Sequence, residues 1–411
     1  MGSFDPRECR VLVLDGDSQA SLTVVASLGA RGVDVTVGSD LPHPIGKFSR
    51  YVDRSFVHPN PGEQPAAFAD QLEAFLADTD HFAVLPTSDD TTTVVARNKG
   101  RLAATDTVVG VEDWPRFRRV ADKARTFSFA DGLDVPTPET RAPESLAEVA
   151  AFADDVAYPV VVKSRSKHVA DRDGRLHTHE VDDSDYAATP LELVTTYERV
   201  LHADEGTRNE PPLVQERVPG ETTTTVGVAR DGDLLAHFQE RRLRTTPASG
   251  GNSTLITGMR DETMLAYARE VVAELGWTGP LQVEFMRTPD GEFYLVEVNG
   301  RYWGSVPLAV ASGVDVPWLH FAVLAGETPR LPDAYREDVV QQRLLYGDLK
   351  WLAEQLADDR NPAAVASFAH ALATTDQVFV RPDDPATTAA ALVEAAGLGA
   401  GALRDAVAAR L

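Results

Sequence analysis

At the start of the chain, two short apolar runs flank a segment in which apolar residues recur with the period of a helix. The run VLVL at 11–14 is followed by a turn, a helical segment from Ser18 to Gly32, and a second apolar run, VDVTV, at 33–37. Serine commonly caps a helix at its start, and glycine commonly ends one. A strand, a helix and a strand in this order predict a βαβ unit with a parallel sheet.

The same alternation continues to about residue 115. AAFADQLEAFLA at 66–77 has the period of an amphipathic helix, FAVLPTSDD at 82–90 reads as a strand ending in a polar turn, and TVVGVEDW at 107–114 reads as another strand. Strand ends of open α/β sheets collect ligands. The polar residues at 87–90 therefore either face a cleft or cap the next helix, and both interpretations stay open.

The pattern changes in the middle of the chain. AYPVVVKSR at 157–165 is typical of a buried strand with Lys163 at its end. Residues 164–190 are polar and lack periodicity, which predicts a long loop or a mobile flap. Apolar and polar positions alternate over 212–246 around RDGD, as in two antiparallel strands, and 261–276 has a helical period. An α+β region is therefore expected after the parallel sheet.

Two acids stand in otherwise apolar runs within VEFMRTPDGEFYLVEVNGRYWGS, residues 283–305. The dipeptide DG at 290–291 predicts a β-hairpin. If these two residues form the loop, Glu284 pairs with Glu297, and Asn299 lies on the same face two residues further on. A longer loop would shift this pairing.

Adjacent carboxylates in an apolar setting repel each other. A shared proton or a bound hard cation removes the repulsion, and Mg²⁺ takes oxygen ligands of this kind. The alternative is a hairpin with solvent-facing acids. The apolar neighbours LQVEF and YLVEVN favour the metal site, because an exposed face would alternate more cleanly.

Composition limits the class of protein. The chain has 411 residues, enough for two or three domains, and 43% of them are apolar. Acids outnumber bases by 63 to 39, and the net charge of −24 predicts a halophilic surface, with an ordinary acidic enzyme as the alternative. Such a surface disfavours nucleic acids and anionic membranes as partners. An anionic ligand would need a local cationic pocket or a bridging metal.

The single cysteine, Cys9, excludes a disulfide framework and a cysteine-based metal site. The first residues, MGSFDPRECR, contain no apolar signal segment, and the run VLVL is too short to span a membrane. A cytoplasmic protein is therefore expected.

Several motifs in order resemble the ATP-grasp superfamily. VEF at 283–285 followed by LVEVNGR at 295–301 resembles its metal-binding strand pair. VVVKS at 160–164 resembles its nucleotide-binding strand, DKARTF at 122–127 the segment with an earlier phosphate-binding lysine, and LVQERVPGE at 213–221 the hinge strand. The closest resemblance is to the carboxylate–amine ligase branch that includes carbamoyl-phosphate-synthase-like proteins.

This resemblance covers about 10–325 and implies a domain order. An α/β pre-ATP-grasp domain with a parallel sheet is expected at 1–118, and an ATP-grasp core, α+β in character, at 119–330. A mobile lid is expected at approximately 128–212. The Ala-rich, helical pattern of 331–411 predicts a helical C-terminal region.

The resemblance also implies a nucleotide site. Lys123 and Lys163 would hold the phosphates of ATP. Glu216 and Val218 would contact adenine, largely through the backbone of the hinge, and Glu221 would accept from the ribose hydroxyls. In ATP-grasp proteins a Gly-rich loop commonly follows the strand lysine, whereas here the segment is SRSKHVADRDGRLH, which leaves the phosphate-covering lid undefined.

The metal and catalytic groups follow in the same way. Glu284, Glu297 and Asn299 would bind Mg²⁺, with Mn²⁺ as the alternative ion, and Arg301 would act with Lys163 in catalysis on the transferred phosphoryl group. HFQERRLRTTPASGGNS resembles the basic strand and glycine turn of the same branch. The substrate residues expected there, unless the arginines only form an ion-paired strand face, are Arg242, Arg244, Ser249, Gly250 and Gly251.

The function implied is an EC 6.3-type ligase that joins a small-molecule carboxylate to an amine, or to a thiol, and releases ADP and phosphate. A non-catalytic ATP-binding sensor or partner subunit is the alternative. A Rossmann-type dehydrogenase is disfavoured because the turn DGDSQAS lacks GxGxxG. A homodimer is compatible with the sequence.

Overall fold

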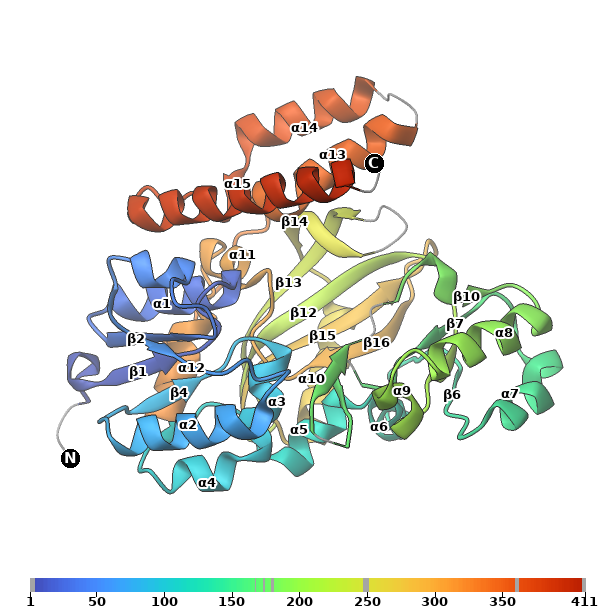
Figure 1. The fold of residues 1–411 in the computed structure, drawn as a ribbon, viewed down its shortest axis with the longest axis horizontal. Helices are drawn as coiled ribbons and strands as arrows, with labels where there is room; N and C mark the ends of the chain where they lie inside the picture. Colours follow the sequence, from blue (N-terminus) through green and yellow to red (C-terminus); the bar gives the residue numbers. More distant parts are fainter. Residues whose placement is uncertain are drawn as a thin grey trace.

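The computed structural model describes residues 4–166, 168–172, 174–178, 181–246, 251–358 and 362–408. Within these ranges the strands form a five-stranded, a four-stranded, a seven-stranded and a two-stranded sheet. Figure 1 shows the N-terminal part, the seven-stranded large sheet and the four-stranded sheet side by side, with the C-terminal helices above the large sheet.

The N-terminal sheet is parallel, as predicted, with the strand order β3-β2-β1-β4-β5. Ser18 caps the first helix, because its side chain accepts a hydrogen bond from the backbone N–H of Ser21. The elements are β1 (Arg10–Val13), α1 (Gln19–Gly29), β2 (Asp34–Ser39), β3 (Val52–Val57), α2 (Pro65–Ala77), β4 (Ala83–Leu85), α3 (Asp89–Arg97), α4 (Lys99–Ala103) and β5 (Val108–Val109).

The four-stranded sheet is antiparallel, in the order β10-β7-β11-β6. Val160 and Val162 of β7 point to one face, where they pack with Tyr197 of α8, so Lys163 points to the other face. Its elements are β6 (Thr140–Arg141), α7 (Leu146–Phe152), β7 (Val160–Lys163), β10 (Tyr186–Ala187), α8 (Pro190–Leu201), α9 (Glu205–Asn209) and β11 (Leu213–Glu216).

The polar segment after Lys163 is more ordered than the predicted loop. It contains an antiparallel pair, β8 (His168–Ala170) and β9 (Leu176–Thr178). The sequence gives little sign of this pair, because each strand has three residues and carries polar side chains.

The large sheet runs in the order β16-β15-β12-β13-β14-β17-β18. The predicted turn RDGD joins β12 to β13, with Asp231 and Gly232 both at positive φ, as a tight hairpin turn requires. The strands are β12 (Glu221–Arg230), β13 (Asp233–Thr246), β14 (Asn252–Met259), β15 (Gly279–Arg287), β16 (Phe293–Asn299), β17 (Val340–Gln342) and β18 (Asp376–Gln377).

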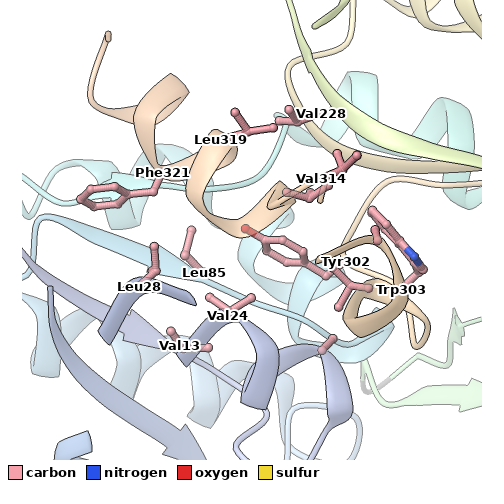
Figure 2. Close-up of a cluster of buried hydrophobic side chains, with 14 of the residues drawn as sticks. Val13, Val24, Leu28, Leu85, Val228, Tyr302, Trp303, Val314, Leu319 and Phe321 are labelled. Atoms are coloured by element: carbon pink, nitrogen blue, oxygen red, sulfur yellow. The ribbon is translucent and has the colours of Figure 1, made fainter. Parts of the chain in front are cut away.

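Helices on the two faces of the large sheet give it two separate cores. One core includes α10 (Glu262–Leu275), together with α5 (Trp114–Ala121) and α6 (Lys123–Ala130). The other includes α11 (Val306–Ala311) and α12 (Val316–Leu324) and continues into the N-terminal sheet. Figure 2 shows Val13 and Val24 beneath Tyr302, with Leu319 and Val228 on the opposite side. Each fully buried side chain of this size stabilises the fold by roughly 1.5–3 kcal/mol, so this core fixes the two parts together.

The C-terminal region is not purely helical, which corrects the prediction. β17 pairs with β14 and β18 pairs with β17, so this region extends the large sheet. Its helices are α13 (Leu349–Asp358), α14 (Pro362–Thr374) and α15 (Pro385–Ala408). None of the helices in the described ranges has the length and apolar character needed to cross a lipid bilayer.

Candidate active site

In the hairpin of β15 and β16, Glu284 pairs with Glu297, as predicted. The predicted two-residue loop is wrong, however, and the pairing depends on an irregularity in β16. The loop has three residues, since Thr288 donates its N–H to Glu292 and Gly291 adopts φ +89°. A three-residue loop alone shifts the pairing by one position and would turn Glu297 to the opposite, apolar face. An irregularity at Val296, opposite the step from Glu284 to Phe285, restores the pairing.

One oxygen of each carboxylate converges on the amide of Asn299. Asn299 Nδ2 lies 3.4 Å from Glu284 Oε1 and 3.5 Å from Glu297 Oε2. The other oxygen of each acid is paired with a cation: Lys123 Nζ lies 3.0 Å from Glu297 Oε1, and Arg242 Nη2 lies 2.8 Å from Glu284 Oε2. Two glutamates and an asparagine from one hairpin therefore meet at one point.

This donor set fits Mg²⁺. Rotating the amide of Asn299 by half a turn places Oδ1, an acceptor, beside the two carboxylate oxygens. Two carboxylates and one amide oxygen leave room for phosphate oxygens and water, the usual further ligands of Mg²⁺. In the part of the chain described, no group of three or more His, Cys, Asp or Glu side chains is placed to hold a metal ion, so the amide is needed to complete this set.

The two predicted phosphate lysines lie beside these acids. Lys163 Nζ donates to Gln215 Oε1 at 2.5 Å, and Lys123 is the first residue of α6. Burial, together with the nearby positive charge of Lys123, lowers the pKa of Lys163 to about 8, while Glu297 and Glu284 act in the opposite sense. Residues from three distant segments thus form one charged cluster.

Arg301 is held by a partner that the sequence did not identify. Its Nε and Nη2 lie 2.5 and 2.7 Å from the two carboxylate oxygens of Asp89, the first residue of α3. Its Nη1 donates to the carbonyl of Tyr302 at 2.6 Å. Asp89 belongs to the polar turn 87–90, where Ser88 also caps α3, so this turn both caps the helix and lies at the site.

Glu240 is a second group that sequence analysis missed. It lies in line with Glu284 across the sheet, because Thr224 pairs with both residues. Its Oε1 accepts from Ser305 Oγ, and its buried Oε2 has no hydrogen-bond partner within the described residues. Burial raises the pKa of Glu240 to about 7. In the sequence, Glu240 stands two residues before Arg242, and residues with this spacing share one face of a strand. This spacing could have pointed to Glu240 as a site residue.

The predicted hinge residues lie at the junction of β11 and β12. The backbone N–H of Glu216 donates to the carbonyl of Glu139 at 2.9 Å. Because this N–H is already used, the carbonyl oxygen of Glu216 would make any backbone contact with adenine. Val218 is half-buried between the two strands. Glu221 begins β12 and lies 3.4 Å from Arg287 Nη1.

The two substrate arginines engage different parts of the molecule. Arg242 contacts Glu284 and donates to the carbonyl of Gly251 at 2.9 Å, whereas Arg244 Nη1 lies 2.7 Å from Asp348 of the C-terminal region. An irregular pairing of β13 with β14 between Arg242 and Arg244 separates them. The other predicted substrate residues, Ser249 and Gly250, lie outside the described residues.

A small cavity of about 40 Å³ adjoins the carboxylate cluster. Its lining includes Glu297, Asn299 and Asp89, together with the basic side chains of Arg97 and Arg118. The site therefore has a place for cations, with basic side chains lining the space beside it.

Comparison with known proteins identifies this arrangement. Residues 208–344 match the family described as "ATP-grasp in the biosynthetic pathway with Ter operon". This segment of the chain belongs to the ATP-grasp superfamily. The matched segment contains the hairpin with Glu284, Glu297 and Asn299, and it ends just after β17.

The chain is also similar to carbamoyl phosphate synthase large chain from Halobacterium salinarum. The two are 26% identical over 283 residues, which is 67% of this chain and 24% of the relative. The chain therefore spans about a quarter of that relative's length.

Solved structures share the ATP-grasp fold at low identity. The biotin carboxylase domain of Hydrogenobacter thermophilus 2-oxoglutarate carboxylase, solved with MgADP and bicarbonate, has a TM-score of 0.62 at 17% identity and covers 80% of this chain and 73% of its own. L-amino acid ligase from Bacillus licheniformis has a TM-score of 0.59 at 16% identity, covering 77% and 74%.

Proposed function

We propose that the protein is a Mg²⁺-dependent ligase that uses ATP to join a carboxylate to an amine through an acyl phosphate. The observation that carries this proposal is the convergence of Glu284, Glu297 and Asn299 beside Lys123 and Lys163. The match of residues 208–344 to an ATP-grasp family and the fold shared with a carboxylase and an amino acid ligase support it.

Nucleotide binding depends on charge neutralisation in a strongly acidic protein. Lys123 and Lys163 would hold the phosphates as point charges, and Glu216, Val218 and the nearby hinge backbone would hold adenine. Mg²⁺, when bound by the two glutamates and Asn299, would neutralise the phosphate oxygens that the acidic surface otherwise repels. Because an arriving phosphate competes for Lys123, its pairing with Glu297 would give way to nucleotide and metal.

The chemistry requires no side-chain nucleophile. A carboxylate oxygen of the substrate attacks the γ-phosphorus of ATP, and the bond from that phosphorus to the bridging oxygen of ADP breaks. The amine nitrogen, or a thiol, then attacks the acyl carbon, the bond to phosphate breaks, and the nucleophile loses one proton to solvent. Arg301, oriented by Asp89, would stabilise the charge on the transferred phosphoryl oxygens.

The substrate acid has a candidate location next to the metal residues. The cavity beside Glu297 and Asn299 is lined by Arg97 and Arg118, whose guanidinium groups suit a carboxylate. We expect variants of Arg118 to raise the KM of the acid more than that of ATP.

Phosphate release tests the proposal. Purified protein is incubated with Mg-ATP and pools of carboxylic acids, amines and thiols, with the E297Q variant as the matched inactive form. Phosphate that appears only when an acid and a nucleophile are both present supports ligation. ATP binding by calorimetry without phosphate release in any pool would contradict the ligase and favour the ATP-binding sensor.

A further inference from the structure

An open cavity of about 460 Å³ lies beside β5, the last strand of the five-stranded sheet. Residues 106–112, which include β5, all line it. The rest of the lining comes from both ends of α4, from His320 and Leu324 on α12, and from Thr278 just before β15. We call this the edge cavity. It shares no described lining residue with the cavity beside Glu297, so it is a separate place in the molecule.

His320 is a buried polar group of the edge cavity that lacks a second protein partner. Its side chain is only 1% exposed, and its Nδ1 lies 2.8 Å from the hydroxyl oxygen of Tyr302. In the described contacts its Nε2 has no hydrogen-bond partner. Trp303 Nε1 is also unpartnered but is sealed from solvent, whereas His320 Nε2 is not sealed. Because His320 lines the edge cavity, Nε2 is open to that cavity.

The contact with Tyr302 decides what His320 Nε2 offers to a ligand. Tyr302 is 1% exposed, and the described contacts give its hydroxyl no acceptor except His320 Nδ1. A buried hydroxyl that does not donate is costly, so the hydroxyl donates and Nδ1 accepts. Burial lowers the pKa of His320 to about 3, so the ring is neutral and carries its one proton on Nε2. Nε2 is therefore a donor that needs an acceptor.

Two further donors line the edge cavity. The residues on either side of Val109 donate their N–H groups to β4, so the N–H of Val109 points away from β4, to the free edge of the sheet. Lys99 Nζ donates to the carbonyl of Val111 at 2.6 Å, and an ammonium group has two more hydrogens to donate. The cavity therefore offers a cation and two neutral N–H groups.

The acceptors of the edge cavity are already used or exposed. Glu112 Oε1 accepts from the N–H of Thr278 at 2.6 Å, and Glu112 Oε2 lies 2.9 Å from Arg116 Nη1. Asp106 also lines the cavity, but it is exposed, so water and salt screen its charge. Much of the remaining lining consists of valine, leucine and alanine side chains. An apolar cavity with a few donors suits a small organic ligand that carries acceptors.

We propose that the edge cavity binds a small monocarboxylic acid with an apolar body. Its carboxylate oxygens accept from the donors of the cavity, with Lys99 neutralising the charge, and its body packs against the side chains of Val109 and Leu324. This site goes beyond the proposed ligase function and does not depend on it. The bound acid is not the reacting carboxylate, because the edge cavity is separate from the cavity beside Glu297.

Binding of simple acids tests the site in the absence of ATP and Mg²⁺. The probes are 4-methylpentanoate and phenylacetate, measured by saturation-transfer NMR and isothermal calorimetry. The matched amines, 4-methylpentylamine and 2-phenylethylamine, carry the opposite charge on similar apolar bodies. We expect the acids to bind and the amines to show no measurable binding. Failure of both acids to bind, or equal binding of the amines, would overturn the inference.

Two substitutions locate the bound acid. Ala103 is exposed and lines the edge cavity, so A103W should fill part of the cavity and abolish acid binding. A104W is the matched control, because Ala104 is exposed but is not a lining residue, and it should bind the acids as the wild type does. K99M keeps most of the aliphatic stem and removes the charge, which should lower the affinity about tenfold. Acid binding that survives both A103W and K99M would overturn the inference.

A last control separates the edge cavity from the active site, which also takes a carboxylate in the proposed function. R118M removes a guanidinium from the lining of the active-site cavity and should leave binding of the probe acids unchanged. Thermal unfolding checks that each variant is folded. Acid binding that R118M abolishes and A103W leaves intact would place the acid in the active site and overturn this inference, while the ligase function would stand.

Discussion

Glu284 and Glu297 face each other across β15 and β16, although the loop that joins their strands has three residues instead of two. The irregularity at Val296 returns Glu297 to the face of Glu284. Without it, Glu297 would point toward the apolar core that contains Phe285 and Phe293. Burying the carboxylate of Glu297 in that core would be costly. The cost of burying a charge therefore favours the pairing of Glu297 with Glu284, which forms the candidate metal site.

Replacing Glu297 with glutamine should abolish Mg²⁺-dependent turnover while the fold survives. The substitution removes one of two carboxylate ligands and keeps the shape of the side chain. We expect phosphate release to fall about 100-fold or more, as for loss of a few kcal/mol of transition-state stabilisation. Circular dichroism should show a similar unfolding curve. The exposed neighbour E292Q, on the same hairpin, serves as the control, and unchanged activity in E297Q would refute the metal role.

Lys163 should matter far more for ATP binding than Lys47 does. K163A should weaken ATP binding measured by calorimetry, whereas K47A should not, because Lys47 is half-buried and donates to Pro42 and His43 of its own loop in the described contacts. The pKa of Lys163, about 8, adds a pH dependence: the free protein loses this charge as pH rises through 8, so ATP affinity should decline there. Equal effects of the two substitutions would remove Lys163 from the site.

The same lysine should limit stability. Its pKa in the folded protein lies below the ordinary value of 10.5, so the unfolded chain binds more protons between about pH 8 and 10.5. Stability from this group therefore rises with pH across that window. K163M should unfold at a higher temperature than the wild type at pH 7, and the difference should shrink above pH 10. A less stable K163M would contradict this account.

Glu240 should produce the opposite dependence in a lower pH range. Its pKa rises from 4.5 to about 7 in the folded protein, so the folded state holds the proton more tightly. The stability it contributes is complete below pH 4.5 and is lost as pH rises through 7. Thermal unfolding at several pH values should show this loss in the wild type and not in E240Q. The exposed variant E198Q should follow the wild type.

Asp89 should act through Arg301. D89N leaves the partly buried guanidinium of Arg301 with a neutral partner, which should cost on the order of 2 kcal/mol of stability. Because Arg301 would also lose its orientation, kcat should fall about tenfold while the KM for ATP changes little. D290N in the exposed hairpin loop is the control. A D89N variant with wild-type kcat would show that Arg301 needs no such support.

High salt should stabilise the protein if the surface is halophilic. Sixty-three acids against 39 bases repel one another at low ionic strength, and salt screens that repulsion over distances of about 10 Å or less. We expect the unfolding temperature to rise between about 0.1 and 2 M KCl. A flat or falling curve would favour the ordinary acidic enzyme instead.

The sequence by itself determined the features that depend on local contacts. The periods of 11–14, 18–32 and 33–37 predicted the βαβ start, and the turn at 290–291 placed Glu284, Glu297 and Asn299 on one hairpin. Neighbouring residues in a strand are set by backbone geometry, so pattern alone locates them. The pairing of Glu284 with Glu297 also needed the irregularity at Val296, which the sequence did not predict. The motif resemblance added the lysines, which no local rule would have joined to the hairpin.

Only the tertiary structure decided which distant groups meet. Asp89 and Arg301 are 212 residues apart in the sequence, and Arg244 pairs with Asp348 of the C-terminal region. A sequence pattern shows which face a residue takes but not which element will pack against it. That choice depends on burial and charge pairing summed over the whole fold, which is why the partner of Arg301 became visible only once the chain was folded.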